Sequence, residues 1–374
     1  MRKHHNWLSA MTVRLMARPE ISVLPLYAPD LAECAVDVSD NTNLWGMPPA
    51  AQRVLADAPM SAAARYPSLY GAPLREAVLR YLELSSAPAI GVVTGCGSDD
   101  VIDATMRAFG GPGDRVAFSA RSFSMIPTFA RLNGLEPVSI PLTDSFDVDA
   151  ERLVDLGAKI TYLCTPNNPT ATLLSRSAVE YVVTHARGVV LLDEAYAEFA
   201  PETFADLTMR AERVLVTRTF SKAFGLAGLR VGYGVGGADL VSMVERARGP
   251  YKVNALAERA ALAALDPADD ALGWVHAHAA LAVQNRERMR TALYEIGLAP
   301  LPSAANFLFV PTARARLLAS ALRTRGVLVR AFTGLPTALP ALAAAGGAAL
   351  RIGIGPWEMM QPVLDGLAEA TVCE

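Results

Sequence analysis

Short apolar runs alternate with amphipathic segments through the middle of the chain. Strand-like runs lie at residues 90–94, 115–119, 137–142, 160–164, 189–192 and 214–217, and segments with helical spacing lie between most of them, at 100–109, 126–133, 149–156 and 177–186. Strands that alternate with helices are typical of an α/β fold with a mostly parallel sheet covered on both faces. Ligands of such sheets bind at the carboxyl ends of the strands, so the residues that follow each run are the first candidates for a site.

The pattern differs on either side of this region. Residues 21–49 are irregular and rich in proline, and helical patterns follow at 48–58 and 73–84. After about residue 250 helical patterns dominate up to 295, and strand-like runs follow at 306–310, 327–331 and 350–353. We therefore predict an N-terminal arm over residues 1–35, a large domain over 36–265 whose first residues can pack on the small domain, and a small α+β domain over 266–374.

Composition narrows the class of protein. The 374 residues are 52% hydrophobic and 19% charged, which is typical of a globular chain, and a net charge of −3 does not favour nucleic acid or an anionic membrane as a partner. The four cysteines are scattered without a C-x-x-C pair, so neither a disulfide framework nor a metal site is expected. The first residues lack the apolar core of a signal peptide, Met11 or Met16 could equally be the start, and no apolar run suits a membrane span, so we predict a cytoplasmic protein.

A lysine, Lys222, follows the strand-like run at 214–217. A lysine in partly apolar surroundings loses some of its preference for the charged form, so it can attack an aldehyde as an amine and form a Schiff base. Thr219, Ser221 and Arg230 are close in sequence and offer hydroxyl and guanidinium donors to an anion. An amine nucleophile beside a phosphate site suggests pyridoxal phosphate, whereas a solvated side chain is the ordinary alternative for a lysine in such a loop.

Two further strand ends carry candidate ligands. The glycine turn Thr94 to Gly97 leads into a helix at Ser98 and Asp99, where free backbone N–H groups can bind an anion, although an ordinary N-cap by Ser98 explains the same residues. Phe123 follows the strand at 115–119 and could stack on a flat ring or belong to the core.

The next two strand ends offer groups for a heteroaromatic ring. Asn168, in a turn bracketed by prolines, can donate to a phenolate-like oxygen, or be simple turn material. Asp193 ends an apolar strand, where a carboxylate needs a partner such as a protonated pyridine nitrogen, and Tyr196 could donate to the ring oxygen. An acid that caps a following helix is the alternative for Asp193.

Together these segments resemble the fold-type-I pyridoxal-phosphate aminotransferases, most closely the histidinol-phosphate aminotransferase branch. The resemblance spans roughly residues 36–370. Its motifs begin at Arg65 (Arg-Tyr-Pro), Gly97 (Gly-Ser-Asp), Pro166 (Pro-Asn-Asn-Pro-Thr), Asp193 (Asp-Glu-Ala-Tyr), Thr219 (Thr-Phe-Ser-Lys-Ala-Phe-Gly-Leu-Ala-Gly-Leu-Arg), Ala305 (Ala-Asn-Phe) and Leu350 (Leu-Arg-Ile-Gly). It implies the family fold, in which a sheet of the seven-stranded type is sandwiched by helices and joined to a smaller α+β domain.

The resemblance also implies roles for individual residues. Lys222 would hold the cofactor covalently and move the proton during the reaction, Asp193 would pair with the ring nitrogen, and Arg351 would bind the substrate α-carboxylate. A homodimer is implied, in which Tyr66 reaches the phosphate of the neighbouring subunit. The remaining cofactor contacts would come from Gly97, Ser98, Asp99, Phe123, Asn168, Tyr196, Thr219, Ser221 and Arg230, and the remaining substrate contacts from Arg330, Trp45 and Asn168.

Departures from the family pattern lie mainly on the substrate side. Phe123 stands where tyrosine is usual, Ala171 where glycine is usual, and Lys252 where a small or amide residue is usual. The arm around Trp45 is altered, and the segment between Arg330, which in the family can help to bind a substrate phosphate, and Arg351 is longer than usual.

We therefore predict an aminotransferase that acts on an amino acid and a 2-oxo acid, with glutamate and 2-oxoglutarate as one pair. The other substrate would be histidinol phosphate or a specialised amino acid. A pyridoxal-phosphate decarboxylase on the same fold is the alternative enzyme. A regulator with a degenerate aminotransferase domain is disfavoured, because no nucleic-acid recognition module is visible.

Overall fold

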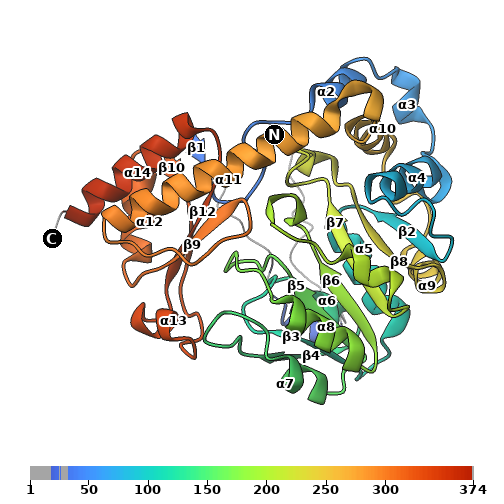
Figure 1. Cartoon of the computed structure of the whole chain (residues 1–374), viewed down its shortest axis with the longest axis horizontal. Coiled ribbons are helices and arrows are strands. Elements are labelled where there is room, and N and C mark those ends of the chain that lie inside the picture. Colours follow the sequence, from blue (N-terminus) through green and yellow to red (C-terminus); the bar gives the residue numbers. More distant parts are fainter. Residues whose placement is uncertain (1–17, 25, 27–32, 373–374) are drawn as a thin grey trace, which may run out of the picture.

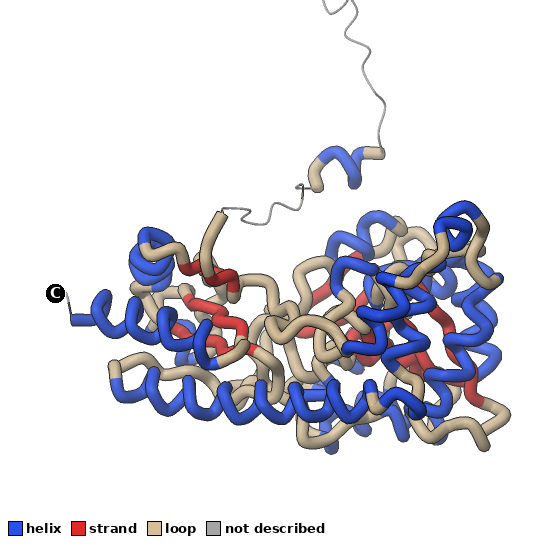
Figure 2. Tube along the Cα trace, turned by 90° about the horizontal axis from the view of Figure 1, so that it is seen from above, coloured by secondary structure: helices blue, strands red, loops and turns tan. Residues whose placement is uncertain are grey.

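A computed structural model describes residues 18–24, 26 and 33–372. The candidate starts Met11 and Met16 lie outside these residues. Figure 1 shows a larger lobe and a smaller lobe, with the 25-residue helix α11 (Ala271–Glu295) running along both. In Figure 2, seen from above, the same long helix runs across the lower part of the picture and passes the strands of both lobes.

The larger lobe is built on a seven-stranded sheet. Its strands, in spatial order, are β2 (Ile90–Gly95), β8 (Gly232–Gly237), β7 (Val214–Thr219), β6 (Val189–Asp193), β5 (Ile160–Cys164), β3 (Arg115–Ser119) and β4 (Glu136–Ile140). The strands from β7 to β4 pair in parallel, and β8 is antiparallel to both of its neighbours. The mixed, mostly parallel sheet confirms the predicted fold class.

The predictions did not include strand β8, because its sequence Gly-Tyr-Gly-Val-Gly-Gly carries little apolar signal. Its glycines are needed for close packing. A Cβ at Gly232 would lie 2.4 Å from the backbone nitrogen of Ser98, and one at Gly236 would lie 2.6 Å from the carbonyl oxygen of Val214. Glycine weakens a strand in general, but here it lets strand β7 and the start of helix α5 (Ser98–Phe109) approach the backbone of β8.

Helices cover this sheet, as the alternating pattern predicted. The connecting helices are α5 (Ser98–Phe109), α6 (Ile126–Leu132), α7 (Ala150–Asp155), α8 (Arg176–His185) and α9 (Ala238–Arg248). The N-terminal part and the segment before α11 add α1 (Pro19–Ser22), α2 (Pro49–Ala56), α3 (Met60–Ala64), α4 (Ala72–Tyr81) and α10 (Ala255–Ala264), and short 3-10 turns occur at Leu69–Gly71, Ala197–Phe199, Ala205–Met209, Ala227–Leu229 and Pro267–Asp269.

The smaller lobe contains a three-stranded antiparallel sheet. Strand β12 (Ala349–Gly353) lies between β9 (Phe307–Pro311) and β11 (Arg330–Phe332), and α12 (Ala315–Thr324) and α14 (Trp357–Val372) belong to the same lobe. The run expected at 327–331 divides into β10 (Val327–Leu328), which pairs with β1 (Val36–Asp37), and β11. The domain boundaries given above stay a prediction.

The longer segment between Arg330 and Arg351 is ordered around a small apolar cluster. It contains the short helix α13 (Pro340–Ala344), and Leu335, Leu339 and Leu342 pack with Phe309 of strand β9. Burial of these leucines attaches the segment to the smaller lobe.

The described part of the chain has no helix with both the length and the apolar character that a membrane crossing requires. Within the same residues, no group of three or more histidine, cysteine or acidic side chains is arranged to hold a metal ion.

Candidate active site

A cavity of about 490 Å³ lies at the carboxyl ends of the parallel strands. Strand ends, the arm around Ser39 and two strands of the smaller lobe all contribute to its wall. Of the predicted site residues, the cavity is lined by Ser98, Asp99, Phe123, Asn168, Asp193, Tyr196, Thr219, Ser221, Lys222, Arg230, Arg330 and Arg351. The fold thus brings together groups that are far apart in the sequence.

Lys222 lies three residues beyond the end of β7 and opens onto this cavity. Its side chain is half-buried, and its Nζ donates to the carbonyl oxygen of Asp40 at 3.2 Å. Desolvation by the surrounding protein, helped by the nearby cation of Arg351, lowers the pKa of Lys222 to about 8. A larger share of this side chain is therefore a neutral amine near neutral pH than for an exposed lysine, and the neutral amine is the nucleophilic form.

Asp193, the last residue of β6, is a buried carboxylate on the cavity wall. Its Oδ2 accepts a 2.6 Å hydrogen bond from the hydroxyl of Tyr162 on β5, and its Oδ1 accepts a 3.3 Å bond from Thr217 on β7. Desolvation raises the pKa of Asp193 to about 6, and the hydrogen bond from Tyr162 opposes this rise. A carboxylate held in this way is suited to pair with a cationic ring nitrogen, because the pairing would offset its lost hydration.

Donors for an anion converge where helix α5 begins. No side chain caps its N-terminus at Gly97, whose φ is +82°, so the first backbone N–H groups at Ser98 and Asp99 are available to a ligand. A Cβ at Gly97 would lie 2.6 Å from Nη2 of Arg230, so glycine leaves room for the guanidinium beside this turn. Nη1 of Arg230 donates to the hydroxyl of Ser221 at 3.3 Å, which aligns two donors from the segment around Lys222.

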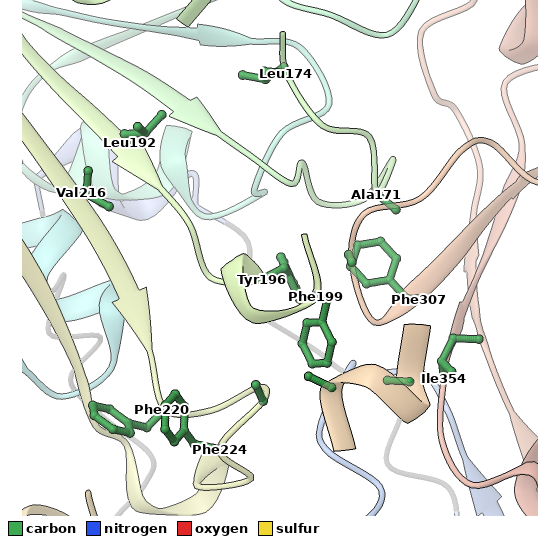
Figure 3. Close-up of a cluster of buried hydrophobic side chains, with 14 of the residues drawn as sticks. Ala171, Leu174, Leu192, Tyr196, Phe199, Val216, Phe220, Phe224, Phe307 and Ile354 are labelled. Atoms are coloured by element: carbon green, nitrogen blue, oxygen red, sulfur yellow. The ribbon is translucent and has the colours of Figure 1, made fainter. Parts of the chain in front are cut away.

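The other side of the cavity holds Tyr196, Asn168 and Arg351. Nη1 of Arg351 donates to Oδ1 of Asn168 at 2.9 Å, so the amide nitrogen of Asn168 is the end that can donate to a ligand. Nδ2 of Asn41 donates to the hydroxyl oxygen of Tyr196 at 3.3 Å, which leaves the tyrosine proton available to another acceptor. Figure 3 shows Tyr196 beside Phe307, and their ring centroids are 5.2 Å apart.

The smaller lobe supplies an apolar and cationic wall. Arg330 and Arg351 are directly opposite each other on strands β11 and β12, and both side chains line the cavity. Like charges opposite each other in a sheet are unfavourable, which points to an anionic ligand as the reason for this pair. Phe332 and Leu335 line the same end, and Nη2 of Arg121 donates to the carbonyl oxygen of Gly334 at 2.8 Å, which ties this wall to the larger lobe.

Phe123 lines the cavity and also packs against the core cluster that includes Phe118. Its ring is half-buried, so its position is compatible both with stacking on a flat ring and with packing in the core.

Three of the predicted site residues are not part of the cavity wall, namely Gly97, which precedes α5, Tyr66 and Trp45. The Tyr66 side chain is exposed, and its ring stacks on Tyr251 with centroids 4.7 Å apart. Trp45 makes an edge contact with His278 of α11, with ring centroids 6.1 Å apart. The role of Tyr66 in a neighbouring subunit and the role of Trp45 in substrate binding stay predictions.

Some residues of the site were not singled out from the sequence. Tyr162 is the strongest partner of Asp193, and Asn41 holds Tyr196, but each depends on pairing between distant segments. Glu194 and Arg218 form a buried ion pair behind the site, in which Nη2 and Nε of the arginine donate to Oε2 at 2.8 and 3.0 Å. For Glu194 and Arg218, the sequence offered one signal: they are the neighbours of Asp193 and Thr219, at the ends of adjacent strands.

The chain is similar to known proteins over nearly its whole length. Residues 35–367 match the family model described as aminotransferase class I and II. The chain is 36% identical to a histidinol-phosphate aminotransferase of Roseiflexus castenholzii over 95% of this chain and 98% of that protein, and 35% identical to an aromatic amino acid aminotransferase of Mycolicibacterium vanbaalenii over 86% and 92%. The crystal structure of histidinol-phosphate aminotransferase from Sinorhizobium meliloti, in complex with pyridoxal-5'-phosphate, has the same fold, with a TM-score of 0.83, 24% identity and coverage of 97% of this chain and 99% of that one.

Proposed function

The chain belongs to the class I and II aminotransferases, and from this premise we propose that its cavity holds pyridoxal phosphate, with which the enzyme moves an amino group between an amino acid and a 2-oxo acid. The observation that carries the assignment is the convergence of Lys222, Asp193 and the donors around Arg230 on one cavity. A lysine with a lowered pKa, a buried acid and an anion site are the three groups that this cofactor requires.

The chemistry of the residues present fits the cofactor. The turn at Gly97 has no Cβ and leaves room for Arg230, and the helix dipole of α5 adds positive potential for a phosphate. Ser98, Asp99, Thr219, Ser221 and Arg230 would hold the phosphate, Asp193 the ring nitrogen, and Asn168 and Tyr196 the ring oxygen.

Pyridoxal phosphate supplies an aldehyde for covalent attachment and a protonated ring that withdraws electrons from the substrate α-carbon. Nζ of Lys222 would hold the cofactor at this aldehyde, and as a neutral amine it would also accept and return the proton at the substrate α-carbon as general base and acid. Asp193 would keep the ring nitrogen protonated, because a neighbouring cation would stabilise its buried carboxylate.

Arg351 would orient the substrate by binding its α-carboxylate with two parallel donors. Its contact with Asn168 fixes the guanidinium at the end of the cavity. Arg330 and the apolar residues Phe332 and Leu335 would receive the remainder of the substrate. We propose glutamate and 2-oxoglutarate as one substrate pair, and histidinol phosphate or an aromatic amino acid as the second amino donor.

We further propose that the enzyme is a homodimer. The side chains of Met60, Tyr66, Leu69 and Tyr251 are exposed, and Tyr66 stacks on Tyr251; a second copy of the chain would cover these apolar groups. In this arrangement Tyr66 would reach the phosphate in the neighbouring subunit.

A test of the proposal combines product analysis with one variant. Purified enzyme with a panel of amino acids and 2-oxoglutarate should form glutamate, whereas release of carbon dioxide without glutamate would contradict the transfer reaction. Lys222→Ala should abolish turnover and covalent capture of the cofactor while the urea unfolding midpoint is retained. The exposed Lys159→Ala serves as the matched control and should behave as the original protein.

A further inference from the structure

Lys252 contacts the first turn of helix α5. Its Nζ lies 3.0 Å from Oδ1 of Asp100, and Oδ2 of the same carboxylate accepts the backbone N–H of Cys96 at 3.1 Å. Asp100 therefore supports the turn that leads into the N-terminus of α5, and Lys252 holds Asp100 from the other side. The side chains of Lys252 and Asp100 are 35% and 12% exposed.

The backbone around Lys252 is constrained on both sides. Tyr251 has a positive φ of +56°, which few residues other than glycine adopt, and Val253 is buried. Asn254 caps helix α10, because its Oδ1 accepts the N–H of Ala257 at 2.9 Å. The backbone at Lys252 is thus held in one conformation, from which the side chain reaches Asp100.

The start of α5 carries two adjacent acids, Asp99 and Asp100. Both would repel a phosphate dianion bound to the first backbone N–H groups of the helix. Each acid has a cation: Nη2 of Arg230 lies 3.4 Å from Asp99, and Nζ of Lys252 lies 3.0 Å from Asp100. Without Lys252, the carboxylate of Asp100 would keep an unpaired charge beside the anion site.

We propose that Lys252 is a positioning residue for the cofactor phosphate, which acts by neutralising Asp100 and holding it against the turn at Cys96. The inference rests on the proposed function, because it takes the phosphate to bind at Ser98 and Asp99. A partly exposed ion pair contributes little to folding, so Lys252 affects binding of the phosphate more than the stability of the fold.

The test measures the affinity of the apoprotein for pyridoxal phosphate by fluorescence titration, and for inorganic phosphate by competition. Lys252→Met should weaken both affinities about five- to ten-fold at low ionic strength, and less in high salt. Lys252→Arg should retain them, and the double variant Lys252→Met with Asp100→Asn should return to within about two-fold of the original protein, because the unpaired charge is gone. The urea unfolding midpoint of Lys252→Met should stay unchanged.

Unchanged affinity in Lys252→Met, or a double variant as weak as the single one, would overturn the inference. Arg230→Met separates this failure from that of the proposed function. If Arg230→Met weakens phosphate binding and Lys252→Met does not, the role of Lys252 alone is wrong. If neither variant weakens binding, the phosphate binds elsewhere, and both the proposed site and this inference fail.

Discussion

Replacement of Asp193 by asparagine should stabilise the apoprotein at neutral pH while it impairs cofactor binding. Burial raises the pKa of this carboxyl from its ordinary value of 3.8 to about 6. Because the folded-state pKa is the higher one, the folded state binds the proton more tightly, so the stability that Asp193 contributes is greatest below pH 4 and is lost as the pH rises to about 6 and beyond. Asparagine avoids this loss, because it carries no charge at any pH in this range.

The size of the effect follows from the two pKa values. A difference of about two pKa units, at about 1.4 kcal/mol per unit, lowers the free energy of unfolding by about 3 kcal/mol at pH 8. About half of this loss develops between pH 5 and pH 8. Asparagine also preserves the local hydrogen bonds: its carbonyl oxygen can accept from Tyr162, and its amide nitrogen can donate to Thr217. Asp193→Asn should therefore gain up to about 3 kcal/mol in the free energy of unfolding at pH 8.

The assay is urea unfolding of both apoproteins, followed by circular dichroism from pH 5 to pH 8. The stability difference between them should widen by about 1.5 kcal/mol over this range. Tyr162→Phe serves as a control in the opposite direction, because loss of a donor to the carboxylate raises its pKa further and should steepen the pH dependence. Parallel pH curves for the original protein and Asp193→Asn, or a variant that is less stable at pH 8, would refute the reasoning.

Three other outcomes can be measured. Arg218→Met should lower the free energy of unfolding by about 3–5 kcal/mol, because it leaves the buried carboxylate of Glu194 without its cation; a loss below about 1 kcal/mol in chemical denaturation would contradict this. Arg351→Lys should raise KM for the amino acid about ten-fold with a smaller change in kcat, because an ammonium cannot form two parallel bonds; an unchanged KM would mean that the carboxylate binds elsewhere. Capture of pyridoxal phosphate by the apoprotein should accelerate with a midpoint near pH 8, as the lowered pKa of Lys222 implies, and a midpoint above about pH 10 would contradict that lowered value.

Much of the fold and of the site was predictable because both leave local signals. Six strands of the large sheet and the intervening helices follow from apolar periodicity. Lys222, Asp193 and Asn168 lie at or just beyond the ends of strands, in segments of recognisable chemistry. Strand β8 was missed, since its glycines satisfy close packing that involves Ser98 and Val214, and no local pattern reports such a requirement.

Taken alone, the sequence determined the family, the alternation of strands and helices, and the side chains that can carry the chemistry, because backbone periodicity and functional groups are local properties. Only the tertiary structure decided how these groups are tuned. Tyr162 bonds Asp193 from 31 residues away, Asn41 bonds Tyr196 from 155 residues away, and Lys252 meets Asp100 across 152 residues. Hydrogen bonds and charge pairs depend on distance in space, which the chain sets only when its distant segments pack together.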